Sequence, residues 1–280
     1  MVENGHKNGS ADMNTMWETH SPLAEQVKTN GIQKVFDEKR ARGEQALKPR
    51  QSKTITCMDG RTEKKAKVAA AESGLYLLVE SKVNIRTLDA EHPGDALRNF
   101  PAIRKFVSDL QDAGIKNTES HKSCGAGDLY AQFFNEQKTW GTMTGDEAAK
   151  LWAQKLAIML GGDYRGHKSV EPGFHPERAA YYSFADAFDP GSAPDVFLPG
   201  YVISRNRFKD GNVSHAAKEM ALAATISFGG HGYGARFTKE NPFFFIVIAK
   251  TQEEAAVGRR ELEPIVAQFG GRVQLQVLIA

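Results

Sequence analysis

The stretch Thr54-Ile55-Thr56-Cys57-Met58-Asp59-Gly60-Arg61 decides the fold, because it joins a short β-branched run to chemically active side chains. The run from Thr54 to Thr56 is typical of a buried strand, so Cys57 is expected at the carboxyl end of that strand. Open α/β sheets place their ligands at this edge. The sequence therefore predicts an α/β fold with a site at Cys57.

A second motif, His121-Lys122-Ser123-Cys124-Gly125, contains the only other cysteine of the chain. Two thiolates and one imidazole form a soft ligand set that suits zinc and also accepts cadmium or another divalent metal. Three protein ligands leave a fourth position open, as in catalytic zinc sites. We therefore predict that Cys57, His121 and Cys124 bind one metal ion.

Asp59 and Arg61 are the candidate catalytic residues. Their spacing of two places Cys57, Asp59 and Arg61 on one side of an extended segment. Zinc lowers the pKa of a bound water to about 7, which makes hydroxide available at neutral pH. Asp59 can accept the proton of this hydroxide and so aim it at an electrophile, while Arg61 can hold Asp59 through a charge-assisted pair.

These residues alone leave three alternatives open. Both cysteines can be small buried hydrophobic residues, which is the common fate of free cysteine. Asp59 can instead be a fourth ligand that closes the shell of a structural zinc ion. In the third alternative, Cys57 is a catalytic nucleophile and His121 is its base. This alternative does not explain Cys124, Asp59 and Arg61. The open zinc site is the preferred interpretation.

The composition is that of an ordinary globular protein. Of the 280 residues, 41% are hydrophobic and 25% are charged, and 36 basic against 34 acidic residues give a net charge of +2. This balance predicts neither a nucleic-acid nor a membrane surface. The segment Met1–Trp17 lacks the apolar core of a signal peptide, and the cysteines suit a reducing compartment, so we expect a cytoplasmic protein.

Three regions are expected along the chain. Residues 1–18 are polar and predict a disordered tail. Residues 19–50 carry a broken helical pattern, which predicts a helical arm that packs on the main domain or on a neighbouring chain. Residues 51–280 predict a single zinc-binding α/β domain. The sequence shows no internal repeat, so one site per chain is expected.

Within this domain the apolar patterns predict the secondary structure. Strands are expected at 54–57, 75–79, 115–120, 243–249 and 272–279, and helices at 101–113, 147–160, 215–226 and 252–269. A turn that opens a helix is expected at Gly125, and irregular structure with a few short elements between 161 and 212. The last strand, helix and strand form a C-terminal β-α-β addition.

The two motifs resemble the signature of the β-class carbonic anhydrases, Cys-x-Asp-x-Arg at a strand end followed by His-x-x-Cys-Gly. The residues that match it position by position are Cys57, Asp59, Arg61, His121, Cys124 and Gly125. The resemblance implies a central mixed sheet flanked by helices, zinc bound by both cysteines and the histidine, and an Asp–Arg dyad that controls the fourth position. It also implies sites at a dimer interface, so a homodimer or higher homo-oligomer is expected.

A second resemblance, to the cadmium-type (zeta-class) carbonic anhydrases, rests on Cys-Met-Asp-Gly-Arg, on the segment from His175-Pro176-Glu177-Arg178 to Tyr181, and on an Ala-rich helix before a Gly-Gly pair. Together the two resemblances cover roughly residues 53–250. The chain departs from them in two places. Residues 85–89 replace the β-class segment of the Arg-Asn-Ala-Gly type, and the cadmium-type enzymes space the histidine and second cysteine more widely.

The function implied by these resemblances is that of a carbonic anhydrase, a lyase that reversibly hydrates carbon dioxide to bicarbonate by zinc-bound hydroxide. Some β-class relatives hydrolyse carbonyl sulfide or carbon disulfide with the same ligands, so such a hydrolase is one alternative. A non-catalytic metal-binding assembly protein is another. His167 and His175 are candidate proton shuttles, although structural or surface roles are commoner for such histidines.

Overall fold

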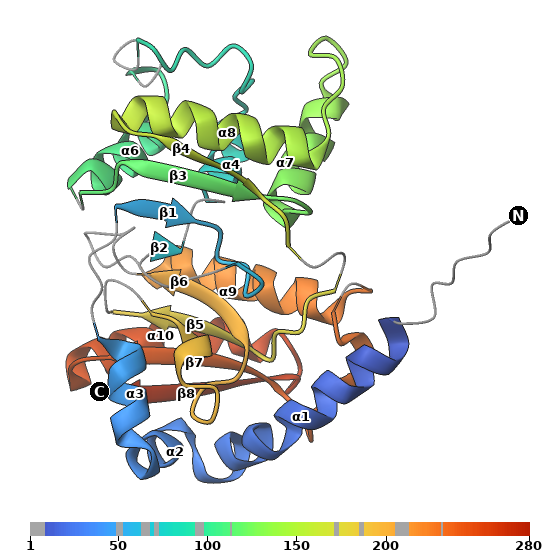
Figure 1. Ribbon diagram of the computed structural model, residues 1–280, viewed down its shortest axis with the longest axis vertical. Coiled ribbons are helices and arrows are strands. Elements are labelled where there is room, and N and C mark those ends of the chain that lie inside the picture. Colours follow the sequence, from blue (N-terminus) through green and yellow to red (C-terminus); the bar gives the residue numbers. More distant parts are fainter. Residues whose placement is uncertain are drawn as a thin grey trace, which may run out of the picture.

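The computed structural model describes residues 9–48, 53–62, 68–69, 73–92, 98–112, 114–170, 174–184, 188–204, 213–230 and 232–280. Within these ranges, two four-stranded sheets are packed with helices, in the orders β2-β1-β3-β4 and β6-β5-β7-β8 (Figure 1). Every pairing between the described strands is parallel. The α/β class is confirmed, but two parallel sheets replace the single mixed sheet that was expected.

The first sheet is built by the first half of the chain. Its strands are β1 (Thr54–Thr56), β2 (Val68–Ala69), β3 (Asn117–His121) and β4 (Tyr164–Lys168). Its helices are α4 (Ser73–Glu80), α6 (Pro101–Asp112), α7 (Gly125–Glu136) and α8 (Gly145–Leu160). Ile55, Tyr130 and Trp152 lie in the apolar core that joins this sheet to these helices.

The second sheet is built by the second half. Its strands are β5 (Ala179–Ser183), β6 (Gly200–Ser204), β7 (Phe243–Ala249) and β8 (Val273–Ile279). Its helices are α9 (Val213–Phe228) and α10 (Gln252–Ala267), with short 3-10 helices η1 (Pro190–Ser192) and η3 (Gly234–Arg236). Strand β7 is buried along its whole length, because a parallel strand in a sheet covered on both faces has no polar side.

The N-terminal arm covers one face of the second sheet. It consists of α1 (Gly9–Asn30), α2 (Ile32–Glu38) and α3 (Arg40–Leu47). Val27, Val35 and Phe36 are buried in one cluster with Phe244 and Ile246 of β7. The described residues of the expected arm form helices that pack on their own chain.

The disordered tail expected over residues 1–18 is wrong from Gly9 onward, where α1 begins. Residues 1–8 lie outside the described part. The reason is Trp17, which is buried and makes edge contacts with Tyr233 and Phe237. The guanidinium carbon of Arg178 lies 3.6 Å from the centre of the Trp17 ring. A long-range aromatic contact thus orders a segment whose polar composition indicates disorder.

Most of the expected secondary structure is confirmed, but the strand expected at 75–79 is part of helix α4. Leu75 and Leu78 are both buried there, three residues apart as on one face of a helix. A short apolar run does not distinguish a strand from a buried helix. The unusually polar strand β3 is confirmed, because Thr118 donates to the Ala153 carbonyl oxygen at 2.6 Å and so satisfies its buried hydroxyl.

The two halves share one topology. In each sheet the first strand along the chain lies between the second and the third, and the fourth lies outside the third. The two halves therefore repeat a strand order and not a residue pattern. For this reason the sequence itself shows no repeat. In the second half, the positions that correspond to Cys57, His121 and Cys124 are occupied by Phe184, Ala249 and Thr251. None of these three is a usual zinc ligand.

The two sheets meet beside the Cys57 motif. Strand β2 contacts β6, and the Val202 amide of β6 donates to the Met58 carbonyl oxygen at 3.0 Å. Figure 1 shows β1 and β2 directly above β6. The loop that follows β1 is therefore held between the halves. Among the described residues, no helix has both the length and the apolar character needed to cross a membrane.

We expect Trp17→Ala to lower the free energy of unfolding by about 3–5 kcal/mol, because it leaves a large cavity against Tyr233 and Phe237. Urea unfolding followed by far-UV circular dichroism measures the change. The control is Ile158→Ala, whose side chain is half exposed and whose effect should stay within about 0.5 kcal/mol. Equal effects of the two substitutions would show that α1 does not dock through Trp17.

Candidate metal centre

The structure brings the three predicted metal ligands together. Cys57 directly follows β1, His121 ends β3, and Cys124 is the N-cap residue of α7. Their Sγ, imidazole nitrogen and Sγ atoms all lie within 4.8 Å of one another, and all three residues are buried. Neither cysteine forms a disulfide. Parallel pairing of β1 with β3 places their carboxyl ends at one edge, which is where the sequence predicted the site.

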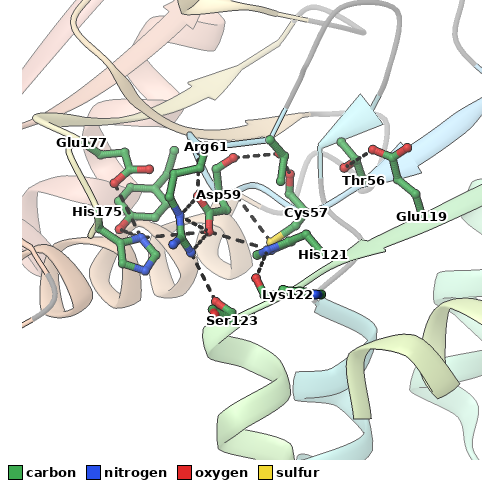
Figure 2. Close-up of polar contacts among 12 residues, drawn as sticks. Thr56, Cys57, Asp59, Arg61, Glu119, His121, Lys122, Ser123, His175 and Glu177 are labelled. Carbon is green, nitrogen blue, oxygen red and sulfur yellow. Dashed lines mark hydrogen bonds and ion pairs between the residues drawn. The ribbon is translucent and has the colours of Figure 1, made fainter. Parts of the chain in front are cut away.

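The orientation of His121 fits a metal ion. Its Nδ1–H donates to the Lys122 carbonyl oxygen at 2.7 Å, which fixes the tautomer and leaves Nε2 facing the cysteines (Figure 2). Nε2 is buried and has no hydrogen-bond partner among the described residues. A buried polar atom without a partner is costly. An ion bound by His121 Nε2 and the two Sγ atoms would satisfy it.

Electrostatics also favour a ligating thiolate at Cys57. Burial by itself raises the pKa of this thiol, but its contacts with the Cys124 and His121 side chains outweigh burial and hold the pKa well below its usual value. The Asp59 amide also lies 3.5 Å from Cys57 Sγ as a donor. Since the thiolate is the form that binds metals, this environment prepares Cys57 for ligation.

Asp59 and Arg61 form a buried ion pair beside these ligands. The Arg61 side chain donates from Nε to Asp59 Oδ1 at 3.0 Å and from Nη2 to Oδ2 at 2.6 Å. The Arg61 amide also donates to Oδ1 at 2.8 Å. Burial opposes ionisation of Asp59, but these contacts with Arg61 outweigh burial and lower the pKa of Asp59 strongly. Asp59 is therefore an ionised carboxylate that only accepts hydrogen bonds.

Two turns set the geometry of the pair. Thr62 closes the first, because its hydroxyl donates to the carbonyl oxygens of Cys57 at 3.1 Å and Asp59 at 2.8 Å. Ser123 shapes the second with a left-handed φ of 53°, and its carbonyl oxygen accepts from Arg61 Nη2 at 3.2 Å. Arg61 thus joins the loop after β1 to the loop after β3.

Gly60 permits the close approach of this loop to the second half. A Cβ at this position would lie 2.6 Å from Glu177 Oε1 and 2.9 Å from the Gly200 carbonyl oxygen. Both distances are shorter than real Cβ contacts. A side chain at residue 60 would therefore push the Cys57–Arg61 loop away from β6.

Three further residues from the second half complete the site, and the sequence did not assign two of them. His175 Nδ1 lies 3.6 Å from Glu177 Oε2, 4.0 Å from Asp59 Oδ2 and 3.2 Å from the Tyr201 hydroxyl. Asp59, His175 and Glu177 form a second buried group that could hold a metal ion. The signal for it was the His-x-Glu spacing just before β5, which places both side chains on one side of an extended segment.

His175 was considered as a proton shuttle, and the structure places it next to Asp59 at the edge of a pocket. His167 lies elsewhere, on β4, where its Nδ1 and the Ser120 hydroxyl are 2.8 Å apart. Burial and neighbouring positive charges lower the pKa of His167 despite the attraction of Asp146. His167 is therefore held as part of the first sheet and does not join the cluster.

Two cavities adjoin the site. A small one of about 20 Å³ lies against the three candidate ligands and is lined largely by Leu75, Ala149, Trp152 and Ala153. A larger one of about 650 Å³ is lined by Arg61, Ser123 and His175 together with the N-terminal turns of α7 and α8. The site thus has a small apolar cavity on one side and, on the other, a wider opening whose lining includes Arg61, Asp128 and Asp146.

No family model, curated protein or solved structure matches the chain. The arrangement of side chains is therefore the basis for any statement about function.

We expect His121→Asn to abolish stoichiometric zinc binding, because it removes one of three ligands. His167→Asn is the matched control, since it changes a nearby, partly buried histidine outside the cluster and should retain one zinc per chain. Metal analysis of zinc-reconstituted, desalted protein measures both. Full zinc content in His121→Asn would exclude the Cys57–His121–Cys124 site.

We expect Gly60→Ala to destabilise the protein by about 1–3 kcal/mol, because the backbone of Gly200 cannot move away as a flexible side chain would. Gly230→Ala is the matched control, because a Cβ there meets no atom within 4 Å. Urea unfolding midpoints compare the two variants. A change at Gly60 no larger than that at Gly230 would contradict the tight contact between the halves.

Proposed function

We propose that the chain is a zinc-dependent carbonic anhydrase that reversibly hydrates carbon dioxide to bicarbonate. The observation that carries this proposal is the placement of Asp59. Its Oδ2 lies 3.8 Å from His121 Nε2, next to the metal-ligand cluster, while both of its oxygens accept hydrogen bonds from Arg61. Asp59 is thus close enough to contact a water at the fourth position without being required as a ligand.

Cys57, His121 and Cys124 would hold the zinc ion. Bound zinc supplies a nucleophilic hydroxide from water at neutral pH. Asp59 accepts the hydrogen of the attacking oxygen, because a carboxylate kept ionised by Arg61 cannot donate one. This hydrogen bond turns the lone pair of that oxygen toward the substrate. Arg61 acts through Asp59 and is a positioning residue.

The two cavities suit the two sides of the proposed reaction. The apolar cavity of about 20 Å³ suits a small, uncharged molecule without a hydrogen-bond donor, and carbon dioxide is such a molecule. That volume holds about one small molecule. Bicarbonate is a charged product, and the wider opening lined by Arg61 and Ser123 offers it a route to solvent.

The alternative of a closed, non-catalytic zinc shell requires Asp59 to turn from Arg61 to the metal. After such a rotation the buried guanidinium of Arg61 would have no carboxylate partner. The loss of one partner from a buried ion pair destabilises a protein by about 3–5 kcal/mol. The Arg61 side chain is only 4% exposed, so water cannot replace Asp59 cheaply. The open site is therefore favoured over the closed one.

We expect Asp59→Asn to lower kcat/KM for carbon dioxide hydration by about 10²-fold or more while zinc stays bound, because an amide no longer accepts with both of its heavy atoms. Asp128→Asn is the control, since Asp128 lines the same opening away from the ligands. Stopped-flow hydration of zinc-loaded protein measures both. Full activity of Asp59→Asn would refute the role of Asp59.

The substrate is tested on the same wild-type preparation. No acceleration of carbon dioxide hydration at alkaline pH, with zinc shown to be bound, would overturn the proposed function. Release of sulfide from carbonyl sulfide or carbon disulfide by that preparation would assign the related hydrolase instead. Absence of both activities would leave a metal-binding assembly role.

A further inference from the structure

Glu177 is a buried acid at the site whose nearest charged contact is His175, with Nδ1 3.6 Å from Glu177 Oε2. Its side chain is fully buried, and neither carboxylate oxygen has a hydrogen-bond partner among the described residues. Burial and the nearby charge of Asp59 raise its pKa. An ionised carboxylate in such a place is costly unless a proton or a cation compensates it.

Nearby positive charge is largely taken up by Asp59. The hydrogen bonds that the Arg61 side chain makes among the described residues run to the Asp59 carboxylate and to the Ser123 carbonyl oxygen. Arg61 and Glu177 attract each other only at longer range. Two carboxylates facing one guanidinium therefore leave one negative charge in the space around His175.

The geometry around that charge is convergent. Glu177 Oε2, Asp59 Oδ2 and His175 Nδ1 all lie within 4.8 Å of one another. Figure 2 shows the carboxylates of Asp59 and Glu177 near the His175 ring, each joined to it by a dashed line. The nitrogen of His175 lies 3.6 Å and 4.0 Å from the two carboxylate oxygens. Metal bonds of about 2.0–2.2 Å would draw these atoms slightly closer together.

We propose that Asp59, His175 and Glu177 bind a second divalent cation, with Asp59 contributing Oδ2 while the Arg61 amide and Nε keep their hydrogen bonds to Oδ1. Two carboxylate oxygens and one imidazole nitrogen form a harder donor set than the thiolate cluster and suit Mn²⁺, whereas thiolates select zinc. The cavity of about 650 Å³ beside His175 gives the ion an entry path and room for water ligands. The Tyr201 hydroxyl, 3.2 Å from His175 Nδ1, gives up that contact when the ion binds.

The second site can be tested by metal binding alone, without measuring carbon dioxide hydration, although both involve Asp59. Wild-type protein is first loaded with zinc to one equivalent and desalted, and Mn²⁺ is then added while the electron paramagnetic resonance signal of free Mn²⁺ is recorded. We expect one further equivalent of Mn²⁺ to be bound. Glu177→Gln, which keeps the shape and removes the charge, should bind Mn²⁺ at least about tenfold more weakly.

Glu119→Gln is the matched control. Glu119 is also buried near the cluster but is paired with the Thr56 hydroxyl at 3.0 Å, on the side away from His175. It should bind Mn²⁺ as the wild type does. Retention of one zinc equivalent shows that each variant is folded. If Glu177→Gln does not fold, His175→Asn replaces it with the same expected loss.

Wild-type protein that binds no Mn²⁺ beyond its zinc would overturn the second site and would show that Glu177 carries a proton instead. Mn²⁺ binding by Glu177→Gln as tight as in the wild type would also overturn it. Carbon dioxide hydration by protein that takes up no second equivalent when Mn²⁺ is added would refute this site alone. Mn²⁺ binding without hydration activity would support the site and refute only the proposed function.

Discussion

The pair between Asp59 and Arg61 is the interaction on which the site depends. Removal of two charges from water costs several kcal/mol for each ion, and only good geometry with further hydrogen bonds offsets this cost. Here the Arg61 side chain spans both carboxylate oxygens and also reaches the Ser123 carbonyl oxygen. The pair therefore ties the loop that carries Cys57 to the loop between His121 and Cys124.

The contact between the halves follows from this arrangement. Since the Cys57–Arg61 loop lies against β6, it needs a residue without a side chain at Gly60 and a backbone hydrogen bond at Met58. On the far side of that contact lie Glu177 and His175, which face Asp59 from the second half. Each half thus supplies buried acids and histidines to one shared volume.

The sequence predicts the ligand cluster well because its determinants are local. A cysteine at a strand end and a His-x-x-Cys turn specify both the ligand type and the sheet edge, and the structure brings Cys57, His121 and Cys124 together there. It also predicts β7, which is a long apolar run, and the helix α10 that follows it. The helix of α4 was missed because eight residues of mostly apolar sequence fit either period.

What the sequence could not predict depends on residues that are distant in the chain. The order of α1 depends on Trp17 meeting Tyr233 and Phe237. The second sheet was not expected as a copy of the first, because a shared strand order leaves no common residue pattern. Glu177 gained its place in the site only through the packing of β6 against the loop after β1.

The shared topology has a consequence for how the site is assembled. Residues that face each other across the contact, such as Asp59 and His175, are parts of a single polypeptide and meet at a high effective concentration set by the chain itself. Dilution cannot separate them, as it would separate two subunits. His175 and Glu177, which face Asp59 from the second half, are therefore in place at any protein concentration. Natural selection could change these residues without altering the candidate ligands in the first half.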